Sequence, residues 1–132
     1  MQNLIVKVKN AIDKVEKEKG EFNLKSLVAK DLSNIQWDLI LSAPWIDEDK
    51  NKALEYLSQN ILSDFDIDCM HQFSGIVLFD TMATTPLVKT LIKIQQDQSN
   101  GKYGEYDLIK SPIESVGWVI PLNNPLSKLE AA

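Results

Sequence analysis

The sequence contains no arginine, because all 14 of its basic residues are lysines. Arginine is the side chain that most often pairs in a bidentate manner with phosphate groups and with guanine. The chain is also acidic, with a net charge of −5, whereas nucleic-acid binding depends first on neutralising phosphates. We therefore expect no nucleic-acid partner.

Cysteine and long apolar runs are scarce as well. The single Cys69 cannot form an internal disulfide framework, and no apolar run reaches the ~18 residues of a membrane span. The N-terminal apolar run, Leu4 to Val6, is followed at once by Lys7 and Lys9, which is unlike a secretory signal. These absences predict a cytoplasmic protein that does not enter membranes.

The length and composition are those of an ordinary globular protein. The chain has 132 residues, of which 44% are hydrophobic and 25% are charged. A chain of this size can bury a core without disulfides or metal ions. We expect one domain over residues 1–125, followed by a C-terminal tail over residues 126–132.

Charge is distributed unevenly along the chain. From Met1 to Lys30, seven lysines accompany four acids, a balance of +3. From Asp31 to Asp80, two lysines stand among ten acids, a balance of −8, and the remaining residues cancel. The acidic middle predicts attraction to basic partners.

The first third of the chain predicts a helix and a β-hairpin. Between Gln2 and Lys19, one face of a helix would carry the apolar residues Leu4, Ile5, Val8, Ala11, Ile12 and Val15. The polar face mixes lysines with acids, which favours packing on the protein's own sheet over lying on a membrane, and Gly20 is a suitable stop. Alternating apolar residues predict strands from Phe22 to Lys30 and from Ile35 to Ser42. The short link between them implies antiparallel pairing.

The middle of the chain predicts a parallel crossover. Pro44 ends the second strand, and the acids at 47–49 mark the beginning of a helix. Ser74 to Phe79 is typical of a strand buried on both faces. Thr85, which precedes a proline, is a suitable N-cap for the next helix. Because a helix joins the two strands, they should be parallel.

The last third is less regular, with candidate short strands from Tyr106 to Ile109 and from Gly117 to Ile120. The predicted class is therefore α/β or α+β. It consists of one mixed sheet of four to five strands, with an N-terminal hairpin, one parallel crossover and about three packed helices.

One acidic pattern resembles a calcium loop without completing it. Asp64, Asp66 and Asp68 alternate as the ligands of such a loop do, but the position that requires glycine holds Cys69. We expect instead an exposed extended edge leading into the next strand, with Ile67 pointing inward.

Two further groups resemble catalytic sets. Cys69 and His71 are too few for a zinc site and lack an oriented third group; we expect them on one side of an extended segment. Asp38, Glu48 and Lys50 match the letters of a restriction-type nuclease motif, but helix capping explains these acids better.

A candidate site lies where the two parallel strands end, because ligands of open α/β sheets bind outside those ends. Asp47 and Asp80, the two acids nearest this edge, disfavour an anion, so a cation or a hydroxyl-rich ligand suits the site better. A tryptophan after a proline in a turn could be exposed and act as an interface anchor. The candidate binding residues are Trp45, Asp47, Glu48, Asp49, Asp80, Thr81, Thr84 and Thr85.

Two functions from different classes fit these residues. The first is a non-catalytic protein-binding module of inhibitor, immunity or accessory-subunit type, which binds a basic protein through its acidic surface and needs no cofactor. The alternative is a divalent-metal-dependent enzyme with Asp47 and Asp80 as ligands and Asp38 nearby. A homo-oligomer is a third possibility, with the helix inside Met1 to Lys30 docking on a neighbour's acidic segment.

Overall fold

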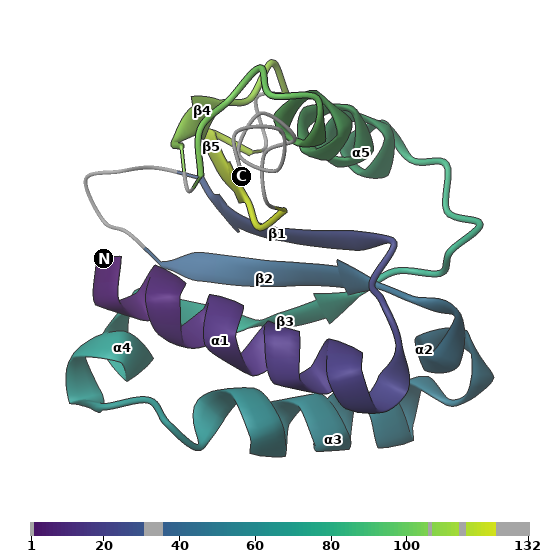
Figure 1. Ribbon diagram of the computed structural model, residues 1–132, viewed down its shortest axis with the longest axis vertical. Helices are drawn as coiled ribbons and strands as arrows, with labels where there is room; N and C mark the ends of the chain where they lie inside the picture. Colours follow the sequence, from purple (N-terminus) through teal and green to yellow (C-terminus); the bar gives the residue numbers. More distant parts are fainter. Residues whose placement is uncertain (1, 31–35, 106, 114–115, 124–132) are drawn as a thin grey trace.

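The computed structural model describes residues 2–30, 36–105, 107–113 and 116–123 (Figure 1). The predicted turn at 31–34 and the predicted tail at 126–132 lie outside these residues, as do Ile35 and Tyr106. Among the helices that are described, none is both long and apolar enough to cross a membrane.

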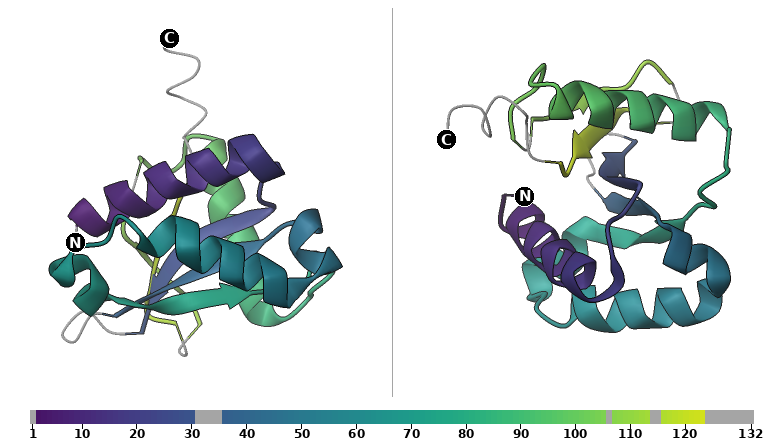
Figure 2. Two further views of the ribbon diagram at one scale, coloured as in Figure 1. Left: turned by 90° about the horizontal axis from the view of Figure 1, so that it is seen from below. Right: turned by 45° about the vertical axis from the view of Figure 1, so that its right-hand side comes forward.

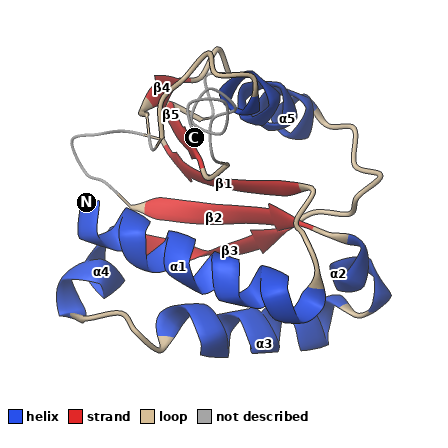
Figure 3. Cartoon of the chain, in the orientation of Figure 1, coloured by secondary structure: helices blue, strands red, loops and turns tan. Residues whose placement is uncertain are grey.

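A mixed sheet of five strands forms the centre of the protein (Figures 1 and 3). Its strands are β1 (Leu24–Ala29), β2 (Trp37–Ser42), β3 (Phe73–Leu78), β4 (Ile109–Lys110) and β5 (Trp118–Pro121). Their spatial order is β3-β2-β1-β5-β4. β2 and β3 are parallel, and the other neighbours are antiparallel. The predicted mixed sheet, hairpin and parallel crossover are therefore confirmed.

Helices cover both faces of the sheet (Figure 2). They are α1 (Gln2–Lys19), α2 (Pro44–Glu48), α3 (Lys50–Leu62), α4 (Ile67–Gln72) and α5 (Pro86–Ser99). The first four pack on one face around Leu27, Trp37 and Leu39, whereas α5 packs on the other face around Val28 and Ile40. The alternation of side chains along β1 and β2 thus fills two separate cores, and Trp37 is buried as expected.

α1 follows its predicted bounds and buries its whole apolar stripe. It ends at Gly20, whose φ of 108° is a left-handed conformation that favours glycine. Near its other end, the Lys7 ammonium donates to the Asp64 carbonyl at 2.7 Å and lies 3.6 Å from the Asp66 carboxylate. The basic helix is therefore packed on the acidic segment of its own chain. Docking on a neighbouring chain stays a prediction.

The acids at 47–49 do not begin a single helix. Pro44 starts the short helix α2, and Asp47 lies inside it. Asp49 then caps α3, since its carboxylate accepts a hydrogen bond from the Lys52 amide at 3.1 Å. Asp47 lies in the first turn of α2, so the predicted helix start is divided between two helices, because the proline that ends β2 also suits the first turn of a helix.

The segment after Asp64 is helical rather than extended. Asp66 is the N-cap of α4, and its carboxylate accepts a hydrogen bond from the Cys69 amide at 2.8 Å. Ile67 is 73% exposed, so the prediction that it points inward is wrong. The alternation of acids reflects a capping residue and its solvated neighbours, and a period of two over five residues was too short to distinguish these possibilities.

β3 differs from its prediction in burial. The run from Ile76 to Phe79 predicts a strand covered on both faces, yet none of the six residues of β3 is buried. β3 lies at the edge of the sheet, and α5 covers β1 and β5 instead. Strands of a parallel sheet are usually buried because they have neighbours on both sides and helices on both faces. β3 pairs with β2 alone among the described strands.

α5 begins where the sequence predicts. Thr85 is the N-cap, with its hydroxyl accepting from the Val88 amide at 3.3 Å, and Pro86 follows. The helix continues to Ser99, and the chain turns at Gly101, where φ is 87°. The two short strands of the last third are also present, each shifted by a residue or more.

Candidate functional site

The structure brings together the predicted residues at the ends of β2 and β3. The Asp47 carboxylate accepts hydrogen bonds from the Thr81 hydroxyl at 2.6 Å and from the Thr81 amide at 3.3 Å. The Asp80 carboxylate lies 2.8 Å from the Lys50 ammonium. α2 and the loop after β3 therefore meet at this edge, as the parallel crossover requires.

The carboxylates of Asp47 and Asp80 have different partners. Asp47 ties α2 to the β3–α5 loop, and Asp80 pairs with the first residue of α3. In the part of the chain that the structure describes, no three His, Cys, Asp or Glu side chains are grouped as a metal site would require. The metal-dependent alternative, with Asp47 and Asp80 as ligands, stays a prediction.

The two remaining loop residues of the predicted set have different roles. Thr85 is occupied as the N-cap of α5. Thr84 is exposed in the loop beside it.

Trp45 is not the freely exposed anchor that its position after Pro44 suggests. Its indole is half-buried and packs between two other rings, with the Phe22 ring centre at 5.9 Å and the Tyr56 ring centre at 6.0 Å. The Trp45 and Tyr56 rings meet edge to face at 86°, which is a favoured aromatic geometry. The tryptophan therefore fixes α2 against α3 while keeping part of its surface open.

A shallow hollow lies beside this aromatic pair. Trp45 and Tyr56 supply its aromatic wall, and Ala53 lies next to them. The charged residues of its rim are Lys19, Glu48, Asp49 and Lys52. We call this recess the aromatic hollow. Three of the predicted site residues, Trp45, Glu48 and Asp49, contribute to it.

α1 contributes two charged groups to the aromatic hollow through Tyr56. The Lys19 ammonium lies 4.9 Å from the centre of the Tyr56 ring, within the range of a cation–π contact. The Tyr56 hydroxyl donates a short hydrogen bond to the Glu18 carboxylate. This bond, together with burial and the negative charge of Glu18, raises the pKa of Tyr56 to about 12.

We expect Tyr56 to ionise only near pH 12, which absorbance at 295 nm would report as one late tyrosine. Because its pKa is raised on folding, this group's contribution to stability is complete below pH ~10 and is lost between pH ~10 and ~12. Glu18→Gln should move the late titration toward the ordinary value of 10.0. An unchanged titration in that variant would contradict the role of Glu18.

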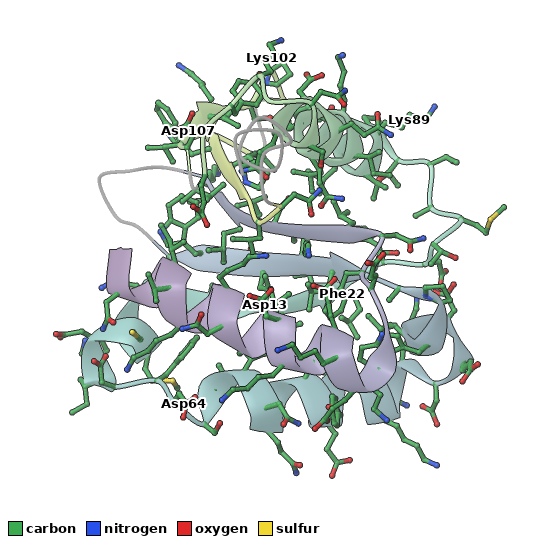
Figure 4. The ribbon with its side chains drawn as sticks, in the orientation of Figure 1. Asp13, Phe22, Asp64, Lys89, Lys102 and Asp107 are labelled. Atoms are coloured by element: carbon green, nitrogen blue, oxygen red, sulfur yellow. The ribbon has the colours of Figure 1, made fainter. Side chains whose placement is uncertain are left out.

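Exposed acids surround the aromatic hollow and continue along α3 and α4. We define the acidic face as the exposed acids of this region: Asp47, Glu48, Asp49, Glu55, Asp64, Asp66, Asp68 and Asp80. Lys50 and Lys52 are the exposed lysines of the same stretch. Figure 4 shows Asp64 on this side of the molecule, with Lys89 and Lys102 projecting from the opposite side near α5.

Several members of the acidic face have no counter-charge. Among the described residues, Glu48, Glu55, Asp64 and Asp68 form no ion pair, whereas Asp80 pairs with Lys50. The backbone amide of Cys69 holds the pKa of Asp66 below its usual range. The negative potential of this face is therefore only partly neutralised within the protein.

The other two residues weighed as catalytic groups are separated by burial. Cys69 is buried and accepts a weak hydrogen bond from the Asn3 amide group at 3.6 Å. Burial also raises the pKa of its thiol, which disfavours the nucleophilic thiolate. His71 is exposed on α4, so the two residues do not share the extended segment that was predicted for them.

Comparisons with known proteins identify no match for this chain, whether among the family models, the curated proteins or the solved structures. The function must therefore be inferred from the aromatic hollow and the acidic face themselves.

Sequence reasoning missed the part of the site that α1 provides. Glu18 and Lys19 resemble any solvated helix end, and Tyr56 lies at the margin of the apolar stripe of α3. Glu18 and Tyr56 are 38 positions apart in the sequence, so no local signal indicates their contact. Only the packing of α1 on α3 brings them together.

Proposed function

We propose that the protein is a non-catalytic binding module that recognises a basic protein partner through its acidic face. The observation that carries this proposal is the placement of the aromatic hollow within a face whose carboxylates are only partly neutralised. Carboxylates attract a basic partner over long distances, and an aromatic wall provides a defined contact at short range.

The chemistry of the aromatic hollow fits the side chain of a lysine or an arginine. Its Tyr56 ring already accepts the Lys19 ammonium at 4.9 Å from the ring centre, so an aromatic–cation contact is compatible with this surface. Glu48 and Asp49 on the rim supply the negative charge that such a side chain requires. A cation from the partner would contact the exposed part of Trp45 in the same way.

The proposal concerns the class of partner and not its identity. An inhibitor, an immunity protein and an accessory subunit would all use an acidic surface in this manner, as electrostatic complementarity governs association rate and specificity. The complex should weaken as salt concentration rises, because exposed charges are screened over about 8 Å at physiological ionic strength.

A short peptide with alternating arginine and lysine residues should bind the aromatic hollow in a nitrogen-15 NMR titration. The three tryptophan indole signals provide the readout. The signal of Trp45 should move, because its ring lines the hollow, whereas that of the fully buried Trp37 should stay in place. The apparent affinity should fall several-fold between 50 and 200 mM salt, because exposed charges are screened more strongly at the higher salt concentration.

Matched variants separate this site from general charge attraction. Glu48→Gln removes one negative charge at the rim, and Gln96→Lys adds one positive charge on the exposed side of α5. Both raise the net charge by one, but only Glu48→Gln should weaken peptide binding by several-fold. Equal effects of the two variants, or a peptide that moves no Trp45 signal, would refute the proposed site.

A further inference from the structure

β3 is an unusual sheet edge because no charge or proline interrupts it. Its sequence, Phe73–Leu78, contains only apolar residues, one serine and one glycine. The opposite edge, β4, has only two residues and one of them is Lys110. Short strands and lysines are the usual protection of a sheet edge against pairing with other chains. Among the described residues, β3 pairs with β2 alone.

Exposed apolar side chains gather on β3 and its two flanks. The described residues include seven large hydrophobic side chains that are exposed. Four of them are in this short stretch: Ile67 at 73%, Met70 at 49%, Val77 at 36% and Met82 at 84%. Ile67 and Met70 are on α4, Val77 is on β3, and Met82 is in the loop between β3 and α5. Such a concentration of apolar surface indicates an interface.

We propose that two copies of this chain form a dimer by antiparallel pairing of their β3 edges, with the two-fold axis at Ile76. The two five-stranded sheets would then form one continuous sheet of both chains. This interface does not include the aromatic hollow, and Asp68 and Asp80 of the acidic face lie beside its two ends.

The backbone of β3 supports a pairing centred on Ile76. The Phe79 amide donates to the Leu41 carbonyl of β2 at 3.0 Å. Backbone groups of a strand turn to alternate sides, so Val77 also faces β2, whereas Ile76 and Leu78 direct their N–H and C=O groups away from it. Antiparallel pairing about Ile76 places the two Ile76 residues opposite each other as a hydrogen-bonded pair.

The same register makes the side chains of the edge self-complementary. It places Val77 opposite Gly75 of the partner subunit, and each pair occurs twice about the axis. Val77 is one of the exposed apolar side chains, and a Cβ added at Gly75 would meet nothing within 4 Å. The valine of each chain would thus fill the open space beside the glycine of the other. This fit, which repeats under the two-fold operation, favours a second copy over an unrelated strand.

The orientation of the pairing matters for the charges at the ends of β3. The C-terminal end carries Asp80 in its ion pair with Lys50, and the N-terminal end follows α4 with Asp68. Parallel pairing would bring the two Asp80 carboxylates together, whereas antiparallel pairing keeps them at opposite ends of the interface. Antiparallel pairing also brings the exposed Met82 toward α4 of the second copy, where further apolar surface is exposed.

Light scattering coupled to size-exclusion chromatography tests the dimer directly. The wild-type protein should show twice the monomer mass of 14.9 kDa, and dilution should dissociate it. Val77→Lys should weaken dimerisation by about tenfold, because it removes the apolar contact with Gly75 and places two like charges on neighbouring positions across the two-fold axis. Leu54→Lys is the matched control, since Leu54 is 41% exposed on α3 and Val77 is 36% exposed. A wild-type monomer at every concentration, or a dimer that withstands Val77→Lys, would overturn the proposal.

Disulfide cross-linking tests the register. In a Cys69→Ser background, Gly75→Cys and Val77→Cys chains are prepared separately and then mixed under mild oxidation. The mixture should form covalent dimers, because opposite residues of a non-hydrogen-bonded pair have Cα atoms about 4.5 Å apart. Each variant alone should form few, since equal positions are offset along the strands. Cross-linking that is equal in all three samples, or absent from a dimeric mixture, would overturn the pairing centred on Ile76.

Discussion

Gly117→Ala is expected to lower the free energy of unfolding by about 3 kcal/mol or more, which would be a large part of the stability of a domain of this size. An added Cβ at this position would lie 2.2 Å from the Lys30 carbonyl oxygen and 3.0 Å from the Lys30 carbonyl carbon. Both neighbours are backbone atoms, so neither can move away as a flexible side chain would. The two chain segments would have to separate.

That separation would disturb the hydrogen bonds that connect β5 to its neighbours. The Gly117 amide donates to the Ala29 carbonyl at 3.0 Å, and the Ser111 amide donates to the Gly117 carbonyl at 2.9 Å. Both bonds lie at the point where β5 begins beside β1. The cost of the methyl group therefore includes weakened backbone hydrogen bonds as well as steric overlap.

Urea denaturation of Gly117→Ala and Gly75→Ala would measure this effect with a matched control. Both glycines are in or beside strands, but a Cβ at Gly75 has open space around it. At a concentration at which the protein is monomeric, Gly75→Ala should change the free energy of unfolding by less than about 0.5 kcal/mol. Similar midpoints for Gly117→Ala and the wild-type protein would show that the Lys30 backbone yields easily at this point.

The close approach of Gly117 to Lys30 could not be predicted from the sequence. The Gly-Trp pair at 117–118 gives no local indication that another chain segment passes close by, because Lys30 is distant in the sequence. By contrast, local signals were sufficient for α1 and α5. A continuous apolar stripe predicts α1, and Thr85 followed by a proline predicts the beginning of α5. These features depend on residues within one or two turns of each other.

The faces of β1 and β2 were predictable for a similar reason. Side chains alternate along a strand, so a strand with helices on both sides needs two apolar sets. The sequence supplies them in Leu27 and Leu39 on one face and Val28 and Ile40 on the other. The position of β3 at the edge was not predictable, because its run of apolar residues is the same whether the second neighbour is a strand of this chain or of another.

The candidate site was predicted in part. The meeting of Asp47 with Thr81 follows from the parallel crossover, which was derived from the order of elements. The contribution of α1 to the aromatic hollow could not be derived, because it depends on how α1 lies across α3. The exact contacts of Glu18 and Lys19 with Tyr56 belong to packing rather than to any local pattern.

The placement of α1 beside the aromatic hollow is fixed by a charged pair two residues before Glu18. The Glu16 carboxylate lies 2.8 Å from the Lys25 ammonium, and it also accepts a hydrogen bond from the Phe22 amide at 3.0 Å. The side chains of Glu16 and Lys25 are only 15% and 11% exposed. A single carboxylate thus connects the last turn of α1 to the loop that follows it and to β1.

The backbone of Lys25 is also connected to the opposite layer. Its amide donates to the Gln95 side-chain oxygen of α5 at 2.8 Å, and the Gln95 side-chain nitrogen donates to the Asn23 carbonyl at 2.8 Å. The pairing of β1 with β5 ends at Ser26 and Pro121, so just beyond that point the Gln95 side chain satisfies the Lys25 amide and the Asn23 carbonyl. Lys25 therefore links α1, β1 and α5. The apolar pattern of α5 alone gave no reason to expect that Gln95 would be buried.

We expect Glu16→Ala to lower the free energy of unfolding by about 3 kcal/mol, because it leaves a largely buried lysine and a backbone amide without their partner. The double variant Glu16→Gln with Lys25→Met should remain within about 1 kcal/mol of the wild-type protein. It removes both charges together and keeps a side-chain oxygen for the Phe22 amide. Urea denaturation of the single and double variants would measure the difference.

Glu16→Ala also tests whether the last turn of α1 keeps the candidate site in place. If Glu16 holds the last turn of α1, its loss should release the contact between Glu18 and Tyr56, and the pKa of Tyr56 should fall from about 12 toward 10. Lys14→Ala is a suitable control, because Lys14 is exposed on the same helix and should alter neither measurement. A Glu16→Ala protein that is destabilised but retains the late tyrosine titration would contradict this link. It would show that α3 holds Glu18 and Lys19 in place without the Glu16–Lys25 pair.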